Sequence, residues 1–118
     1  MYSITENELG CIIIDDEVIA RMAGLAAMDC YGVVGMAAKN VKDGIVHLLK
    51  IESLTKGVRI ERTGDLLTIE LHIIVVYGTN ISAIADSLIS TVKYRVEEHV
   101  GVKVGQINIF VEGVRVDK

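Results

Sequence analysis

The chain has 118 residues, a net charge of −4 and 51% hydrophobic residues. That length fits a single domain over residues 1–118 with one core, and the acidic balance, with 12 Lys and Arg scattered along the chain, disfavours nucleic acid as a partner. Counted with the 11 glycines, apolar residues exceed the roughly 45–50% of an average domain, so we expect a homo-oligomer in which a second subunit covers some apolar surface.

The cellular location follows from the first residues and the length of the apolar runs. Glu6 and Glu8 stand where a secretory signal would carry a basic start, and no apolar run approaches the roughly 20 residues needed to cross a bilayer. Cys11 and Cys30 are too far apart for a C-x-x-C site, and two such thiols are typical of a reducing compartment. We expect a cytoplasmic protein that does not itself insert into a membrane.

The first predicted elements are a strand and a helix that follow one another directly. The apolar run Gly10–Ile14 is followed by acidic residues at 15–17, which can cap a helix and favour its N-terminal end. From Val18 the helix has an apolar stripe on one side and small, nearly uncharged residues on the other, a pattern that favours packing on two surfaces. The stripe is Ile19, Met22, Leu25 and Ala26, and the small residues are Ala20, Ala23, Gly24 and Ala27.

The middle of the chain predicts a short strand and then a β-hairpin. Residues 34–38 form the short strand, while residues 39–56 give mixed signals with one helical turn around 45–49. Apolar residues then alternate with polar ones from Val58, and the alternation resumes from Leu67 after a turn at Thr63–Asp65. The second strand becomes apolar on both faces at Ile74 and Val76, as a central strand does.

The last third of the chain predicts a helix and a final strand. Thr79 or Asn80 caps the helix, and Gly101 ends it. Its stripe comprises Ile81, Ile84, Ala85, Leu88, Ile89, Val92 and Val96. The final strand alternates from Ile107 to about Val116. The order β-α-β-β-β-α-β predicts a two-layer α+β domain with two main helices on one face of a single mixed sheet.

Several blocks of sequence carry a resemblance to a known family. They are the opening Gly10-x-Ile12-x-Ile14 with its acidic helix start, the junction Asp29–Met36, the strand end Val75–Gly78 and the closing segment Val104–Val114. In this order, over residues 9–116, the chain resembles the alkaline-shock, envelope-stress-response family of Gram-positive bacteria, most closely its short single-domain branch.

The resemblance implies a setting for the protein and no chemistry. It implies a cytoplasmic, non-enzymatic protein that self-associates and reaches the envelope through a membrane-anchored protein partner. The family has no established catalytic residues to transfer, so no catalytic, cofactor or metal site is assigned to this chain.

Asp29 is the first of four residues that we assign to structural turns. It ends the first helix, where the helix dipole disfavours an acid, so it needs a partner. We expect this partner to be either the backbone N–H groups of the Tyr31–Gly35 turn or a basic side chain. Asp29→Ala is then expected to reduce stability rather than abolish an activity.

The other three turn residues are Gly32, Gly35 and Gly78, each of which allows a backbone conformation that other residues avoid. Gly32-Val33-Val34-Gly35 also matches the GxxG loop of KH RNA-binding domains in form. Its interior is apolar, no basic residue follows before Lys39 and a strand rather than a helix is expected next, so we interpret it as a tight turn.

The remaining polar residues do not form a recognisable catalytic pattern. His47, His72 and His99 fall in different segments without metal-ligand spacing and are expected at the surface. The serines of the second helix lack the Gly-x-Ser-x-Gly elbow of a hydrolase.

The outer face of the second helix offers the candidate interface. Ala83, Ser87, Ser90 and Tyr94 follow the spacing i, i+4, i+7, i+11, which makes a ridge of small residues that ends in an aromatic. Such a ridge permits close helix packing, so we expect it, together with the small face of the first helix, to bind a second copy or a partner.

The sequence therefore favours a non-enzymatic interaction protein of the cell-envelope stress response. Two other readings remain open: a small-ligand or lipid-sensing regulatory module, and a KH-like RNA-binding domain. Co-purified small molecules would indicate the first of these, and a salt-dependent shift of RNA the second.

Overall fold

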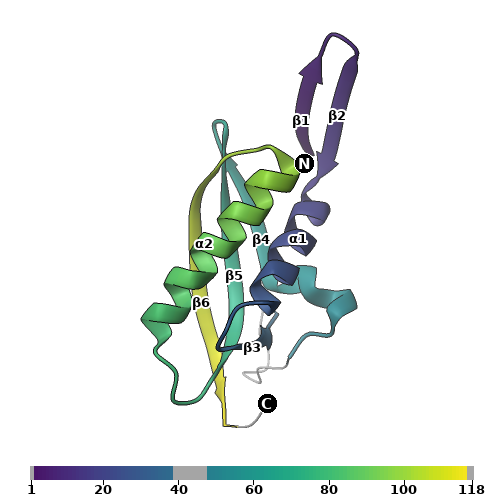
Figure 1. Ribbon diagram of the computed structural model, residues 1–118. Helices are drawn as coiled ribbons and strands as arrows, with labels where there is room; N and C mark the ends of the chain where they lie inside the picture. The colour runs from purple at the N-terminus through teal and green to yellow at the C-terminus, as the bar shows by residue number, and fades with distance from the viewer. Residues whose placement is uncertain (1, 39–47, 117–118) are drawn as a thin grey trace.

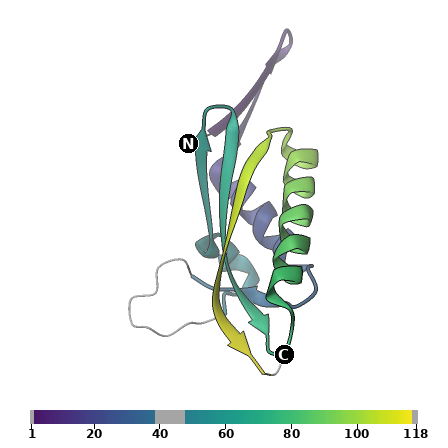
Figure 2. The ribbon, with the colours of Figure 1, turned by 90° about the vertical axis from the view of Figure 1, so that its left-hand side faces the viewer.

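The computed structural model describes residues 2–38 and 48–116 (Figure 1). Its strands are β1 (Tyr2–Asn7), β2 (Gly10–Asp15), β3 (Val33–Met36), β4 (Val58–Thr63), β5 (Leu66–Val76) and β6 (Val104–Arg115). Its helices are α1 (Asp16–Met28), the 3-10 helix η1 (Ile51–Gly57) and α2 (Ile81–Val100). The predicted α+β class is confirmed, and Figure 2 shows α1 and α2 on the same side of the main sheet.

Strand β5 is the centre of a four-stranded mixed sheet. Strand β6 pairs with it in parallel, and β4 and β3 pair with it antiparallel, β4 along residues 66–71 and β3 along residues 73–75. Because β6 runs beside β5 from end to end, β4 and β3 share the opposite edge of β5. The expectation of a central strand is confirmed, since Ile73, Ile74 and Val75 are almost fully buried.

The expected single sheet is wrong in one respect. Strand β2 pairs only with β1, a strand that the sequence analysis did not predict, and the two form a separate antiparallel hairpin. The physical reason is the direct junction to α1: Asp15 ends β2 and also caps α1, accepting a hydrogen bond from the Glu17 amide at 2.9 Å. Without a loop, β2 continues outward past the N-terminus of α1, away from the main sheet (Figure 1).

The core lies between the sheet and the two helices. Alternate residues of β5 face it, and the buried side of α2 contributes Ile84, Leu88, Val92 and Val96, as the 3.6-residue period predicted. Asn80 caps α2 by accepting a hydrogen bond from the Ala83 amide at 3.1 Å. Helix α2 ends at Gly101, whose φ of +80° is the left-handed conformation common after helices.

Helix α1 packs with the side that the sequence analysis placed outward. Ala20, Ala23, Gly24 and Ala27 are buried against α2 and η1, whereas Leu25 of the predicted stripe is exposed. An added Cβ at Gly24 would lie 3.2 Å from the Leu54 Cβ in η1. The second packing surface of α1 is therefore inside the chain, and only small residues allow the neighbouring elements so close.

The segment between β3 and β4 is described only in part. The helical turn expected around 45–49 falls mainly on residues 45–47, which lie outside the described residues. In the described part, helical structure occurs at η1, which leads directly into β4.

Candidate functional site

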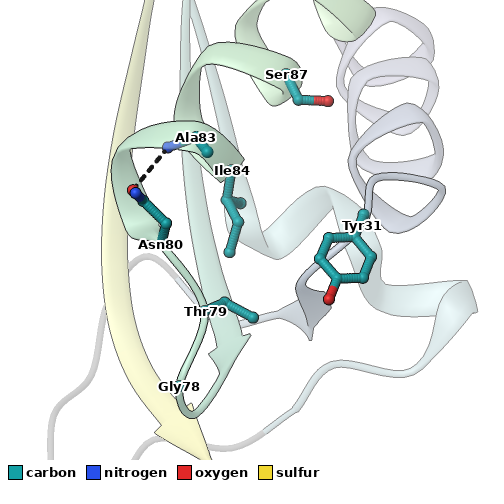
Figure 3. A pocket seen from close by; sticks show the side chains of 7 residues that line it. All are labelled: Tyr31, Gly78, Thr79, Asn80, Ala83, Ile84 and Ser87. Atoms are coloured by element: carbon teal, nitrogen blue, oxygen red, sulfur yellow. Dashed lines mark hydrogen bonds between the residues drawn. The ribbon is translucent and has the colours of Figure 1, made fainter.

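A pocket of about 430 Å³ lies where the α1–β3 turn meets the start of α2 (Figure 3). Tyr31 forms one side, and the β5–α2 loop and the first turns of α2 form the other. The lining residues are Tyr31, Gly78, Thr79, Asn80, Ala83, Ile84 and Ser87.

Two glycine-containing turns build the pocket. Gly32 and Gly78 have φ values of +86° and +87°, a region that side chains disfavour. The two turns are joined because the Val76 amide donates a hydrogen bond to the Gly32 carbonyl at 3.0 Å. The Thr79 hydroxyl donates to the Val76 carbonyl at 2.6 Å, which holds the loop before α2. The position of the pocket is thus determined by the pairing of β3 with β5.

The floor of the pocket depends on a close contact at Gly32. A Cβ added there would lie 2.4 Å from the Ile84 Cδ1 and 2.7 Å from its Cγ1. Figure 3 shows Ile84 projecting from α2 into the space in front of Tyr31. Ile84 can reach this position only because residue 32 has no side chain.

The expected ridge on α2 extends the same surface. Ala83, Ser87, Ser90 and Tyr94 are all exposed, and Tyr94 has 67% of its surface accessible. Ala83 and Ser87 also line the pocket, whereas Ser90 and Tyr94 continue along the helix beyond it. We call this combined surface, from Tyr31 across the pocket to Tyr94, the α2 surface.

The sequence analysis did not identify Tyr31, Thr79 or Asn80 as part of a site. Tyr31 and Gly78 stand in the two sequence blocks that end one element and begin the next, which was the available signal. Their proximity depends on a strand pairing that links segments more than 40 residues apart.

The second element of the expected interface is wrong. The small face of α1 cannot bind a partner, because α2 and η1 already cover it. Gly35 is also misplaced: it lies within β3, beside an irregularity in the pairing with β5, and not in the turn that contains Gly32. A Cβ at Gly35 would lie 2.7 Å from the Leu48 Cδ2, so close packing explains the glycine there.

Asp29 has a partner from a distant part of the chain. Its Oδ2 accepts a hydrogen bond from Nη1 of Arg95 in α2 at 2.6 Å, and both side chains are exposed. The ion pair joins the C-terminal end of α1 to α2. The basic side chain that was one of the two expected partners is therefore present.

We predict a small effect for Asp29→Ala. Exposed ion pairs contribute about 0.2–1 kcal/mol, because solvent screens them and both side chains lose freedom. Urea denaturation should show a loss in this range, and Asp29→Ala should cost little further in an Arg95→Ala background. A loss above about 2 kcal/mol, or full additivity of the two changes, would show that the ion pair is not the reason.

His72 is buried, so its expected surface position is wrong. Only 7% of it is accessible, and it alternates with the core residues Leu71 and Ile73, which places it on the sheet face away from the helices. Its Nδ1 lies 2.6 Å from the Glu112 Oε2, and its ring stacks on Phe110 with centroids 4.7 Å apart. Cross-strand neighbours on β6 therefore cover it. His99 is exposed, and His47 lies outside the described residues.

The chemistry that the pocket offers is contact and hydrogen bonding. Its lining, within residues 2–38 and 48–116, supplies hydroxyl, amide and apolar groups and no carboxylate or imidazole. Over the same ranges, no group of three or more His, Cys, Asp or Glu is placed to hold a metal ion. A strand follows the Gly32 turn, whereas a KH loop joins two helices. None of the described helices has both the length and the apolar character that crossing a bilayer requires.

Comparison with known proteins gives close relatives over nearly the whole chain. The uncharacterized protein YloU of Bacillus subtilis (strain 168) is 48% identical over 111 residues, which cover 93% of this chain and 92% of YloU. An uncharacterized protein of Streptococcus pyogenes serotype M6 is 32% identical over 108 residues, covering 91% of this chain and 89% of that protein. No solved structure matches the chain significantly.

A more distant relative has a name that refers to stress. It is the stress response regulator gls24 homolog of Streptococcus pyogenes serotype M3, which is 28% identical over 115 residues covering 95% of this chain and 63% of that longer protein. The family model that matches residues 4–116 is that of the alkaline-shock proteins, described as having a cell envelope-related function. With that match and the relatives above, the chain belongs to the alkaline-shock protein family.

Proposed function

We propose that this protein acts in the cell-envelope stress response as a non-enzymatic, cytoplasmic interaction protein that binds a second copy of itself and protein partners. Family membership supports the envelope setting, and the printed name of the gls24 homolog supports the link to stress. The observation that carries the mode of action is the α2 surface, a continuous exposed strip that includes a pocket.

The α2 surface has the features of a protein-binding surface. Its middle, at Ala83, Ser87 and Ser90, is made of small side chains, which allow a partner helix or strand to approach the backbone closely. Its two ends carry exposed tyrosines, Tyr31 and Tyr94. Tyrosine combines a large apolar ring with a polar end, and it is enriched at interfaces for that reason. The pocket between the tyrosines can accept one side chain of a partner.

The partner at the envelope is proposed to be a membrane-anchored protein. In this proposal the chain itself stays in the cytoplasm, and its association with the membrane depends on the α2 surface binding that protein. No substrate is converted, so the proposal requires only reversible contacts from the groups that line the pocket.

Tyr94→Glu tests the proposed function. A charge at the end of the ridge would be desolvated in any interface there, so we expect self-association or capture of a membrane-anchored partner to weaken at least about tenfold. Analytical ultracentrifugation and pull-down from membrane extracts give the two readouts. Lys93→Gln is the matched control, since it makes the same change in net charge at an exposed neighbour off the ridge. If Tyr94→Glu leaves both readouts unchanged, the α2 surface is not the interface.

The pocket favours a second candidate function, the sensing of a small ligand. Its volume lies at the lower end of the roughly 300–1,000 Å³ of ligand sites. Native mass spectrometry of protein purified from its own cells would show a bound small molecule. Ser87→Phe would fill the pocket mouth and should remove that molecule while leaving the fold intact.

A further inference from the structure

The β1–β2 hairpin lacks the support that a two-stranded sheet needs. Its six residue pairs run from Tyr2↔Asp15 to Asn7↔Gly10, and neither strand pairs with the main sheet. Ile12 and Ile13 are 59% and 57% exposed. As neighbours in a strand they point to opposite faces, so both faces of the hairpin expose an isoleucine. An isolated two-stranded hairpin is at best marginally stable in water, and a third strand normally supports it.

Strand β6 has the opposite deficiency. It is 12 residues long and pairs with β5 along one edge, while no other strand of residues 2–38 and 48–116 pairs with its outer edge. Phe110, Val111 and Val114 are exposed apolar residues near the C-terminal end of this edge. Long, apolar edge strands readily accept another strand, because their outward N–H and C=O groups are unpaired. At about 3.3 Å per residue the edge is roughly twice as long as a hairpin strand.

The hairpin and the edge cannot meet within one chain. In Figure 1, β6 lies on one side of the sheet, and the hairpin projects on the other side, with β5, β4 and α1 between them. The direct junction of β2 to α1 prevents the hairpin from folding back. At that junction Arg62 in β4 also hydrogen-bonds to Asp16, which ties the start of α1 to the sheet. The missing third strand must therefore come from another molecule.

Charge selects which surface of the other molecule the hairpin can bind. The hairpin carries Glu6, Glu8 and Asp15 and no basic residue, so two hairpins would repel each other. Strand β6 is bordered at its two ends by the exposed Lys103 and Arg115. We propose that the β1–β2 hairpin of one copy adds to the outer edge of β6 of a second copy, over the segment that exposes Phe110, Val111 and Val114.

This inference rests on the self-association in the proposed function and assigns to it a contact outside the α2 surface. The contact is heterologous, since it joins two different surfaces of the two copies. It would give the hairpin a third strand and cover apolar residues on both partners.

Ile13→Lys is the first test. We expect it to weaken self-association at least about tenfold in sedimentation, because a charge on the hairpin opposes strand addition. Thermal melting should change little, since residue 13 lies outside the core. Val18→Lys is the matched control: it introduces the same charge at an exposed apolar residue on α1, beyond the end of the hairpin.

A disulfide experiment in the full chain tests the contact directly. Cys11 is a free, exposed thiol on β2, and Cys30 is buried. In a Val111→Cys variant, mild oxidation should give an intermolecular disulfide between Cys11 of one copy and the thiol introduced at position 111 of another, identified by mass spectrometry of the tryptic peptides. Val18→Cys serves as the control for random collision.

The outcomes separate this inference from the proposed function. If Ile13→Lys leaves association unchanged while Tyr94→Glu disrupts it, or if crosslinks form only between two Cys11 thiols, the hairpin–β6 contact is wrong and the proposed function stands. If the wild-type chain remains a monomer at every concentration, the hairpin contact fails, and partner capture through the α2 surface is still measured independently.

Discussion

Gly32→Ala is expected to lower the free energy of unfolding by about 2–4 kcal/mol. Two costs combine. A left-handed backbone conformation costs a residue with a Cβ about 1–2 kcal/mol, and residue 32 has a φ of +86°. The new Cβ would also lie 2.4 Å from the Ile84 Cδ1, so Ile84 must move, and overpacking of this kind typically costs about 1–3 kcal/mol.

Gly78→Ala is a control that separates the two costs. Its φ of +87° is nearly identical to that of Gly32, but an added Cβ would have nothing within 4 Å. We expect Gly78→Ala to lose only the backbone cost, about 1–2 kcal/mol. Urea denaturation of both variants measures the difference. Ile84→Val removes the Cδ1 atom and should reduce the penalty of Gly32→Ala, whereas equal losses at residues 32 and 78 would contradict the role of Ile84.

The same variant bears on the pocket. Ile84 lines it, so any displacement of Ile84 by a methyl group at residue 32 changes the space in front of Tyr31. Gly32→Ala should therefore weaken partner or ligand binding at the α2 surface even below its unfolding temperature. Gly78→Ala retains the Ile84 position and should have less effect.

Leu88→Ala is expected to destabilise the protein by about 2–5 kcal/mol. Leu88 is fully buried on the side of α2 that faces the sheet, in the same cluster as Ile69 and Ile73 of β5. Removing its side chain forfeits the transfer free energy of the lost atoms and leaves a cavity that the surrounding elements fill only in part. The loss should appear as a lower urea midpoint with an unchanged slope.

The neighbouring Ile89 provides the control for this change. It has the same number of side-chain atoms and the same helical environment, but it is exposed. Ile89→Ala should cost less than about 1 kcal/mol. If the two variants lost equal stability, the assignment of the inner and outer faces of α2 would be wrong. The α2 surface would then be wrongly placed as well.

Patterns of local period were sufficient to predict much of the fold. Helix α2 and the β4–β5 hairpin alternate apolar and polar residues with the periods of a helix and a strand, so their inner faces could be read directly. Capping residues marked the ends of elements for the same reason. Asp15, Asn80 and Gly101 each satisfy or terminate the backbone of a helix through atoms within a few residues.

The errors concern residues whose surroundings come from distant segments. Helix α1 has apolar residues on one side and small ones on the other, and both sides could be buried in principle. The close approach of η1 and α2 decides in favour of the small side. His72 alternates with core residues as a polar position should, yet Phe110 and Glu112 of β6 cover it.

Sequence alone thus determined the α+β class, the face of α2 that is buried and the ridge that remains outside, because side-chain period and capping are properties of neighbouring residues. Only the tertiary structure decided that Tyr31 and the start of α2 share a pocket, that Asp29 pairs with Arg95 and that the first hairpin stands apart from the main sheet. These features depend on which strands pair and how closely helices approach, and such contacts join residues far apart in the chain.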